Sequence, residues 1–157
     1  MNATADELAG VVDLFGGLTR DELERALEEV AFRADGGSVD EDLEETIEGA
    51  LESFALVCYE LPTAEERALL VVGPTAFPTV PEHATDLPHI LDLEPRRLDR
   101  EALGEQAHER FVRAVDDALA DGDDDRLADL LDVSYDLEAW APIDCTTDRE
   151  RLDGGLE

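Results

Sequence analysis

The amino-acid sequence predicts an α+β fold that is mainly helical, and three observations support this. Apolar residues recur at helical spacing, behind helix start signals, in the first third of the chain. Two short runs of β-forming residues follow, separated by a polar connection. Helical spacing returns after a proline-rich stretch. With 157 residues the chain can bury one proper core, so we expect one domain or two small lobes that share a core.

Three helices are expected at the start of the chain. Each begins with a capping box, in which a Ser or Thr and a Glu three residues later satisfy each other's backbone N–H groups. The three pairs are Thr4 with Glu7, Thr19 with Glu22, and Ser38 with Glu41. Glycine pairs end the first two helices, and the third is expected to continue to Phe54.

An antiparallel hairpin is expected next. Residues 55–61 are rich in β-formers and stop at Pro62, and residues 68–73 form a second such run. Five of the seven prolines then fall between Gly73 and Pro95, which predicts an extended connector over residues 74–98. We expect this connector to pack onto the core through its apolar residues, which are Phe77, Val80, Leu87, Ile90 and Leu91.

The C-terminal part, residues 99–143, is expected to be helical and to share the core of the first lobe. Asp99 caps a long fourth helix that ends at Asp121-Gly122, and a fifth helix runs from about Asp124 to Val133. Tyr135, Leu137 and Trp140 are the expected anchors of the next segment. Residues 144–157 are polar and are expected to form a frayed tail.

The composition of the chain indicates its solvent. There is no lysine: all 12 basic residues are arginine, set against 42 Asp and Glu, for a formal net charge of −30. In dilute buffer this density of like charge opposes a compact state. At 1 M salt the Debye length falls to about 3 Å, so neighbouring carboxylates hardly interact. The composition therefore predicts a cytoplasmic protein of an extreme halophile.

The location of the protein is predicted from three features. Cys58 and Cys145 belong to no C-x-x-C pair, so we expect reduced, buried thiols rather than a disulfide. The first ten residues lack both the basic and the apolar segment of a signal peptide. The strand-like apolar run of residues 68–72 is far shorter than the roughly 20 residues that span a bilayer. We expect a soluble, cytoplasmic protein with no membrane partner.

Two resemblances follow from these patterns. In element order and spacing, residues 4–73 resemble a winged-helix domain, which implies a winged-helix-like lobe over residues 1–73. The whole chain is similar to an uncharacterised family of small acidic proteins from halophilic archaea. The segments that carry this similarity are DELAGVVDLFGGLTRDELERAL, LLVVGPTAFP and LLDVSYDLEAWAPID. That family has no assigned activity, so the resemblance implies habitat and fold and identifies no functional residues.

DNA binding is the first alternative function that the winged-helix resemblance raises. The third helix would enter the major groove, yet no basic residue lies between Arg33 and Arg67, and the helix is rich in Glu. Salt screening removes repulsion without creating attraction. An anion or nucleic-acid contact would therefore come from four other residues, Arg96, Arg97, Arg100 and Arg67. The competing interpretation is that these arginines form ordinary helix ion pairs or an internal bridge.

A metal site at His83 and His89 is a weaker alternative. Their spacing in a proline-rich segment is unlike the tight spacings of structural zinc sites, so loop or core histidines are the simpler interpretation. His108 is expected at the surface of the fourth helix. No nucleophile elbow, P-loop or dinucleotide loop is present in the sequence. We therefore expect a non-enzymatic interaction or regulatory module that needs no cofactor and whose partner is another protein.

Overall fold

Helices form most of the structure, as predicted. The computed structural model describes residues 4–35, 42–60 and 68–156, and over these residues it contains seven helices and one two-stranded antiparallel sheet. The chain divides into two compact units, Met1–Leu98 and Asp99–Glu157. A core shared by the two units stays a prediction.

The first unit begins with α1 (Ala5–Phe15) and α2 (Arg20–Asp35). Both predicted capping boxes are present. At the first, the Glu7 N–H donates to Thr4 Oγ1 and the Thr4 N–H donates to Glu7 Oε1, each at 3.2 Å. At α2 the same exchange joins Thr19 and Glu22, at 3.2 and 3.0 Å. The third expected pair, Ser38 with Glu41, lies outside the described residues, and α3 is Leu43–Glu52.

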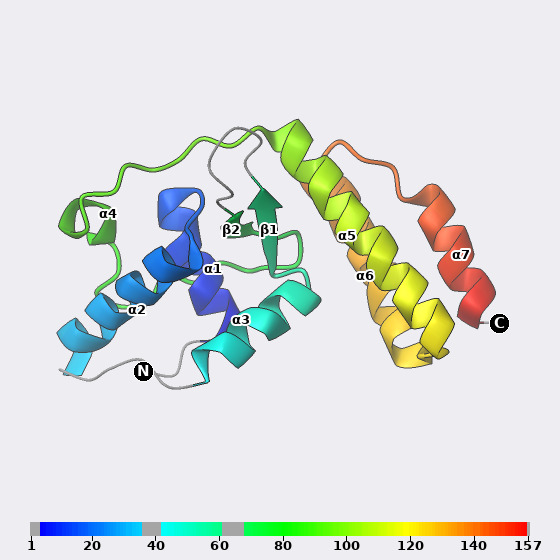
Figure 1. Ribbon diagram of the computed structural model, residues 1–157, viewed down its shortest axis with the longest axis horizontal. Coiled ribbons are helices and arrows are strands. Elements are labelled where there is room, and N and C mark those ends of the chain that lie inside the picture. The colour runs from blue at the N-terminus through cyan, green and yellow to red at the C-terminus, as the bar shows by residue number, and fades with distance from the viewer. Residues whose placement is uncertain (1–3, 36–41, 61–67, 157) are drawn as a thin grey trace. The chain divides into compact units, whose positions relative to one another are not determined.

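The core of the first unit is built around α1. This helix contacts α2, α3, the hairpin and a short fourth helix, and Figure 1 shows these elements grouped around it. Its apolar face supplies the centre of the buried cluster, with residues Leu8, Val11, Val12 and Phe15. The other elements complete the cluster, with Leu23 and Leu27 from α2, Ile47 from α3, and Leu56 and Leu70 from the strands.

The predicted hairpin consists of β1 (Leu56–Glu60) and β2 (Ala68–Val72), paired antiparallel so that Cys58 faces Leu70. A further pairing flanks β2 on its other side. The Leu18 N–H donates to the carbonyl of Leu70 at 3.0 Å, and the Leu70 N–H donates back to Leu18 at 2.6 Å. The α1–α2 turn is thereby joined to the hairpin.

The proline-rich connector lies against α1, and only some of its apolar residues are buried. A short helix, α4 (Leu87–Ile90), which the sequence did not predict, brings Leu87 into the core. The expectation that Phe77 and Val80 pack down is wrong: their exposed fractions are 80% and 44%. Backbone hydrogen bonds hold this part of the connector, so its side chains need not be buried.

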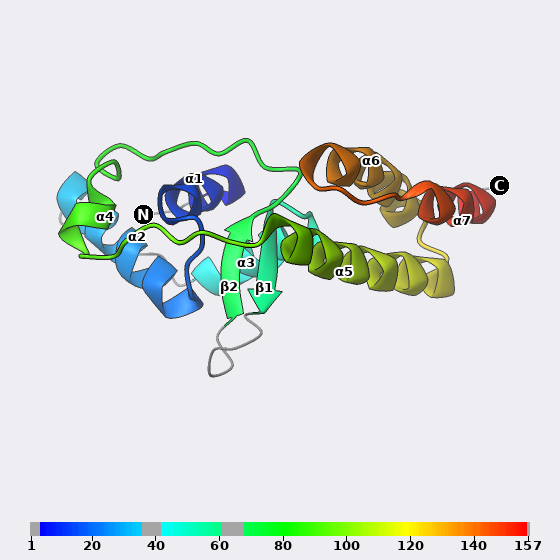
Figure 2. The same ribbon diagram turned by 90° about the horizontal axis from the view of Figure 1, so that it is seen from above.

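The second unit contains three helices, α5 (Arg100–Asp121), α6 (Asp124–Trp140) and α7 (Thr146–Leu156). Figure 2 shows α6 running back alongside α5, and α5, α6 and α7 all contact one another. Asp99 caps α5 as predicted, with its side chain accepting the N–H groups of Glu101 and Ala102. The residues that fill the interior include Leu103, Phe111, Val115, Leu130, Leu137 and Leu152.

Three expectations about the C-terminal segment are wrong. The fifth predicted helix does not end at Val133 but continues to Trp140, and Tyr135 is 59% exposed rather than an anchor. The tail is not frayed, because α7 occupies most of residues 144–157. Tertiary contacts stabilise this polar helix. Leu152 is fully buried. Helix α7 lies so close to α5 that a Cβ on Gly155 would be 2.5 Å from Leu119 Cδ2.

Candidate functional site

Arg96 is an internal bridge of the first unit. Its guanidinium donates to both carboxylate oxygens of Glu22, at 2.7 and 3.0 Å, and to the carbonyl of Gly17 at 2.8 Å. The hydrogen bond from Arg96 holds the pKa of Glu22 below its usual value. The Arg96 N–H also donates to the carbonyl of Phe15. Arg96 therefore joins the end of the connector to α1 and α2. These contacts agree with the interpretation of Arg96 as an internal bridge.

The other predicted anion-binding residues differ in their surroundings. Arg100 stacks on Trp140, with its guanidinium carbon 4.9 Å from the ring centroid, and donates to the carbonyl of Trp140 at 3.0 Å. Arg97 is exposed. Arg67 lies outside the described residues. The exposed face of α3 is acidic and includes Glu44, Glu45, Glu48 and Glu52.

The two histidines of the predicted metal site are exposed. His83 lies in a turn with a φ of 72°, and His89 lies in α4. Among the described residues, the one group of three side chains with metal-ligating atoms close together lies elsewhere and includes neither of them. That group consists of His108, Cys145 and Asp148 in the second unit.

An exposed apolar segment, residues 77–80, is held against the start of α1. The Phe77 N–H donates to Asp6 Oδ1 at 3.3 Å, and the Thr79 N–H donates to the carbonyl of Asp6 at 3.0 Å. The Thr79 hydroxyl donates to the carbonyl of Phe77 at 3.2 Å. The contact with α1 is so close that a Cβ on Gly10 would lie 2.1 Å from the carbonyl oxygen of Thr79. The segment therefore has a defined conformation although Phe77 and Val80 face solvent.

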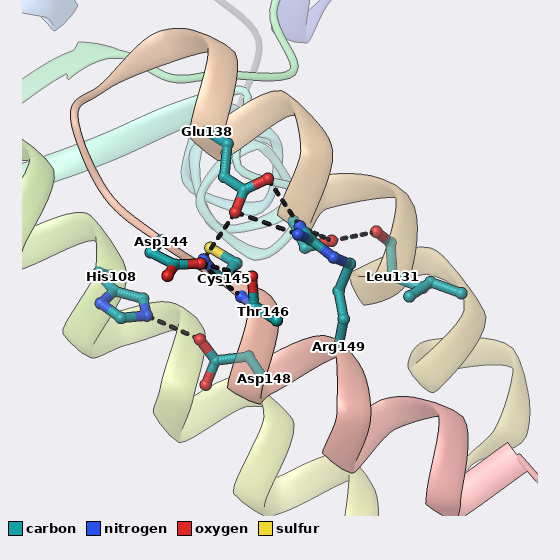
Figure 3. A network of polar contacts seen from close by, with 9 residues as sticks. His108, Leu131, Glu138, Asp144, Cys145, Thr146, Asp148 and Arg149 are labelled. Carbon is teal, nitrogen blue, oxygen red and sulfur yellow. Dashed lines mark hydrogen bonds and ion pairs between the residues drawn. The ribbon is translucent and has the colours of Figure 1, made fainter.

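The group of His108, Cys145 and Asp148 joins α5 to the start of α7. His108 Nε2 lies 2.7 Å from Asp148 Oδ2, and one ligating atom from each of the three residues lies within 4.8 Å of the other two (Figure 3). Asp148 is 6% exposed and Cys145 is fully buried, whereas the His108 side chain is 31% exposed. A carboxylate, an imidazole and a thiol thus meet at a largely buried position with one accessible side.

A second layer of polar contacts fixes Cys145. Its N–H donates to Glu138 Oε2 at 2.8 Å, and Arg149 donates to both oxygens of Glu138, at 2.8 and 3.2 Å (Figure 3). The hydrogen bond from Arg149 lowers the pKa of Glu138. The Arg149 guanidinium carbon lies 4.5 Å from the centroid of the Tyr135 ring. Glu138 and Arg149 therefore position the backbone from which Cys145 and Asp148 project.

The chemistry open to this group follows from the state of its thiol. Burial raises the pKa of Cys145 to about 11, and the carboxylates of Asp148 and Glu138 act in the same direction. The thiolate is the nucleophilic form of cysteine, so Cys145 in this state is a poor nucleophile at neutral pH. The same three side chains offer sulfur, nitrogen and oxygen donors to a metal ion, which displaces the thiol proton on binding.

The sequence does not predict this group, because it indicates a surface position for His108 and no partner for Cys145. The one local signal was the spacing of Cys145 and Asp148, three residues apart at the start of a helix, which puts both side chains on one face. The polar composition of residues 144–157 predicts a frayed tail instead, which gives this spacing no helix to act on. The expectation of two buried thiols holds for Cys145, whereas Cys58 is partly exposed; both are free cysteines.

The comparisons with known proteins identify a family. The model of the family of unknown function DUF7109 matches residues 6–157. The chain belongs to this family. No match was found among curated proteins or among solved structures. The similarity to an uncharacterised family is thus confirmed, while the winged-helix resemblance and the halophilic archaeal origin stay predictions. Among the described residues, no helix is both long enough and apolar enough to cross a membrane.

Proposed function

We propose that this DUF7109 protein is a non-enzymatic interaction module that binds a partner protein through the segment of residues 77–80. The observation that carries the proposal is the exposure of Phe77, which is 80%, in a segment held by hydrogen bonds to α1. Exposed aromatic side chains that fill a partner's pocket are typical centres of binding energy in protein interfaces.

The restrained backbone favours binding at this segment. A loop that is already ordered loses less conformational entropy when it binds. Pro78 fixes its own φ, and Asp6 accepts two backbone N–H groups of the segment, from Phe77 and Thr79. The close contact with Gly10 limits movement toward the helix. The backbone that carries Phe77 is therefore already ordered before a partner binds.

The charge of the protein defines the partner's chemistry. Exposed acidic residues, Glu82 and Asp86, follow the segment in sequence, and the whole chain carries a net charge of −30. A partner suited to this surface offers an apolar pocket for Phe77 with arginine or lysine at its rim. In concentrated salt the charge attraction is screened, so apolar contact supplies most of the affinity.

The test compares three full-length proteins as baits in extract of the source cells at molar KCl. They are the wild type, Phe77→Ala and Phe32→Ala. Phe32 is a matched control because it is an aromatic residue of the same unit that is 67% exposed on α2. We expect a partner that the wild type and Phe32→Ala retain and that Phe77→Ala loses by at least about tenfold, the loss of roughly 1.4 kcal/mol. Equal recovery by all three proteins would overturn the proposal.

DNA binding through Arg96, Arg97, Arg100 and Arg67 has less support. The guanidinium of Arg96 is occupied by Glu22, and that of Arg100 lies on Trp140. Among the described residues, no group of three metal-ligating side chains includes His83 or His89, so a metal-dependent activity there also has less support. Fluorescence anisotropy with duplex DNA over a KCl series is the test of the DNA alternative, because phosphate contacts strengthen steeply as salt is lowered.

A further inference from the structure

We propose that His108, Cys145 and Asp148 form a binding site for a divalent metal ion of the zinc class. This site is independent of residues 77–80 and lies in the other unit. Its donors are the imidazole Nε2 of His108, the Sγ of Cys145 and a carboxylate oxygen of Asp148. Sulfur, nitrogen and oxygen donors together are typical of zinc sites, whereas calcium and magnesium select oxygen alone.

The geometry requires only small movements. In a tetrahedral zinc site with ligand bonds of 2.0–2.3 Å, neighbouring donor atoms lie roughly 3.3–3.6 Å apart. Here the His108 and Asp148 atoms are 2.7 Å apart, and all three donors lie within 4.8 Å of one another. An ion between them would lengthen the first distance and shorten the longer ones. Cys145 and Asp148 lie three residues apart at the start of α7, so rotation of their side chains changes these distances without moving the helix.

The surroundings of the site favour a bound cation. The carboxylate of Asp148 brings negative charge to a place where Cys145 is fully buried. The adjacent cation, Arg149, is already paired with both oxygens of Glu138. A divalent ion would neutralise Asp148 and a Cys145 thiolate together. Buried charges are tolerated where they are paired or coordinate a metal.

The supporting contacts resemble those that metal sites use. Groups outside the ligand set commonly fix the ligands' orientation, and their loss typically lowers metal affinity by about 10- to 100-fold. Glu138 has this role here because it accepts the N–H of Cys145 and is itself held by Arg149. The partly exposed side of His108 leaves room for a fourth ligand, such as a water molecule. Because the ligands come from α5 and α7, the ion would also clamp these helices together.

Cobalt titration of the purified, metal-free full-length protein in concentrated KCl tests the proposal. Tetrahedral Co²⁺ with a thiolate ligand gives a thiolate-to-metal charge-transfer absorption that surface carboxylates cannot produce. We expect this absorption to saturate at one Co²⁺ per chain and to disappear when Zn²⁺ is added. A wild-type protein that shows no such absorption overturns the proposal.

Two cysteine variants assign the signal. Cys58→Ser is the matched control, since Cys58 lies in the other unit and belongs to no such group within the described part of the chain. It keeps Cys145 as its one thiol, so it must retain the full absorption even if Cys145→Ser fails to fold. A signal lost in Cys58→Ser and kept in Cys145→Ser contradicts the assignment. Asp148→Asn should weaken Co²⁺ binding at least about tenfold, whereas His83→Gln should leave it unchanged.

Discussion

Two glycines in helices offer a sharp test of how the connector packs on α1. Gly10 lies in α1 and Gly49 in α3, and each is replaced by alanine in the full-length chain. A Cβ added at Gly49 meets nothing within 4 Å. A Cβ added at Gly10 would lie 2.1 Å from the oxygen of Thr79 and 2.8 Å from the N of Val80, well inside the 3.4 Å at which ordinary contact begins.

The same helix preference acts at both positions and favours alanine by about 1 kcal/mol. At Gly49 this is the whole effect, so Gly49→Ala should stabilise the protein by about 1 kcal/mol. At Gly10 the segment must move away, which costs about 1–3 kcal/mol for overpacking and about 1 kcal/mol for the hydrogen bond from Thr79 to Asp6. Gly10→Ala should therefore destabilise the protein by about 1–3 kcal/mol.

The assay is urea unfolding in molar KCl, followed by far-UV circular dichroism. Trp140, the one tryptophan of the chain, lies in the second unit, so its fluorescence does not report directly on α1. The two variants should move the midpoint in opposite directions relative to the wild type. A Gly10→Ala protein as stable as Gly49→Ala would refute the packing of the connector on α1. Because Gly10→Ala displaces residues 77–80, it should also reduce partner recovery.

Three further predictions concern the rest of the molecule. Glu22→Gln should lower the free energy of unfolding by about 1–2 kcal/mol at pH 7, because it weakens the hydrogen bonds with Arg96. The pKa of Glu22 in the folded state is lowered from 4.5, so the wild type is more stable than the variant above that pH. The difference between their urea midpoints should therefore shrink as the pH falls below that value. Leu152→Ala should cost about 2–5 kcal/mol by Trp140 fluorescence, and no effect would indicate that α7 does not pack. The melting temperature should rise with KCl from dilute buffer to several molar, and an unchanged value would contradict the screening of the acidic surface.

Local signals predicted α1, α2 and the hairpin of the first unit. The capping boxes at Thr4 and Thr19 formed because each pairs a side chain with backbone groups three residues away, a relation that sequence alone defines. The hairpin followed from its β-formers and flanking prolines. The capping boxes and the hairpin depend on residues close together in the chain, so the sequence alone is enough to predict them.

Elements held by distant contacts were not predictable in the same way. Helix α7 is polar, and it depends on the burial of Leu152 and on Gly155 fitting against Leu119 and Leu127. The exposure of Phe77 could not be inferred either, since its hydrogen bond to Asp6 joins residues far apart in sequence. An apolar side chain is expected to be buried, but whether Phe77 is buried depends on the tertiary fold around it.

The candidate metal-binding group shows the same limit. Its histidine is on α5, and its other two residues are at the start of α7, so the group exists only once these helices pack. The sequence offered only a weak candidate pair, His83 with His89, whose spacing is unlike that of structural zinc sites, and both are exposed in the structure.

Photo-crosslinking from position 77 tests the proposed interaction most directly. A photoreactive phenylalanine analogue is placed at Phe77 in one protein and at Phe32 in another, and both are irradiated with extract of the source cells in molar KCl. The proposal predicts one dominant crosslinked protein from position 77 that is weak or missing from position 32. No crosslinked protein from position 77, or the same set from both positions, would contradict it.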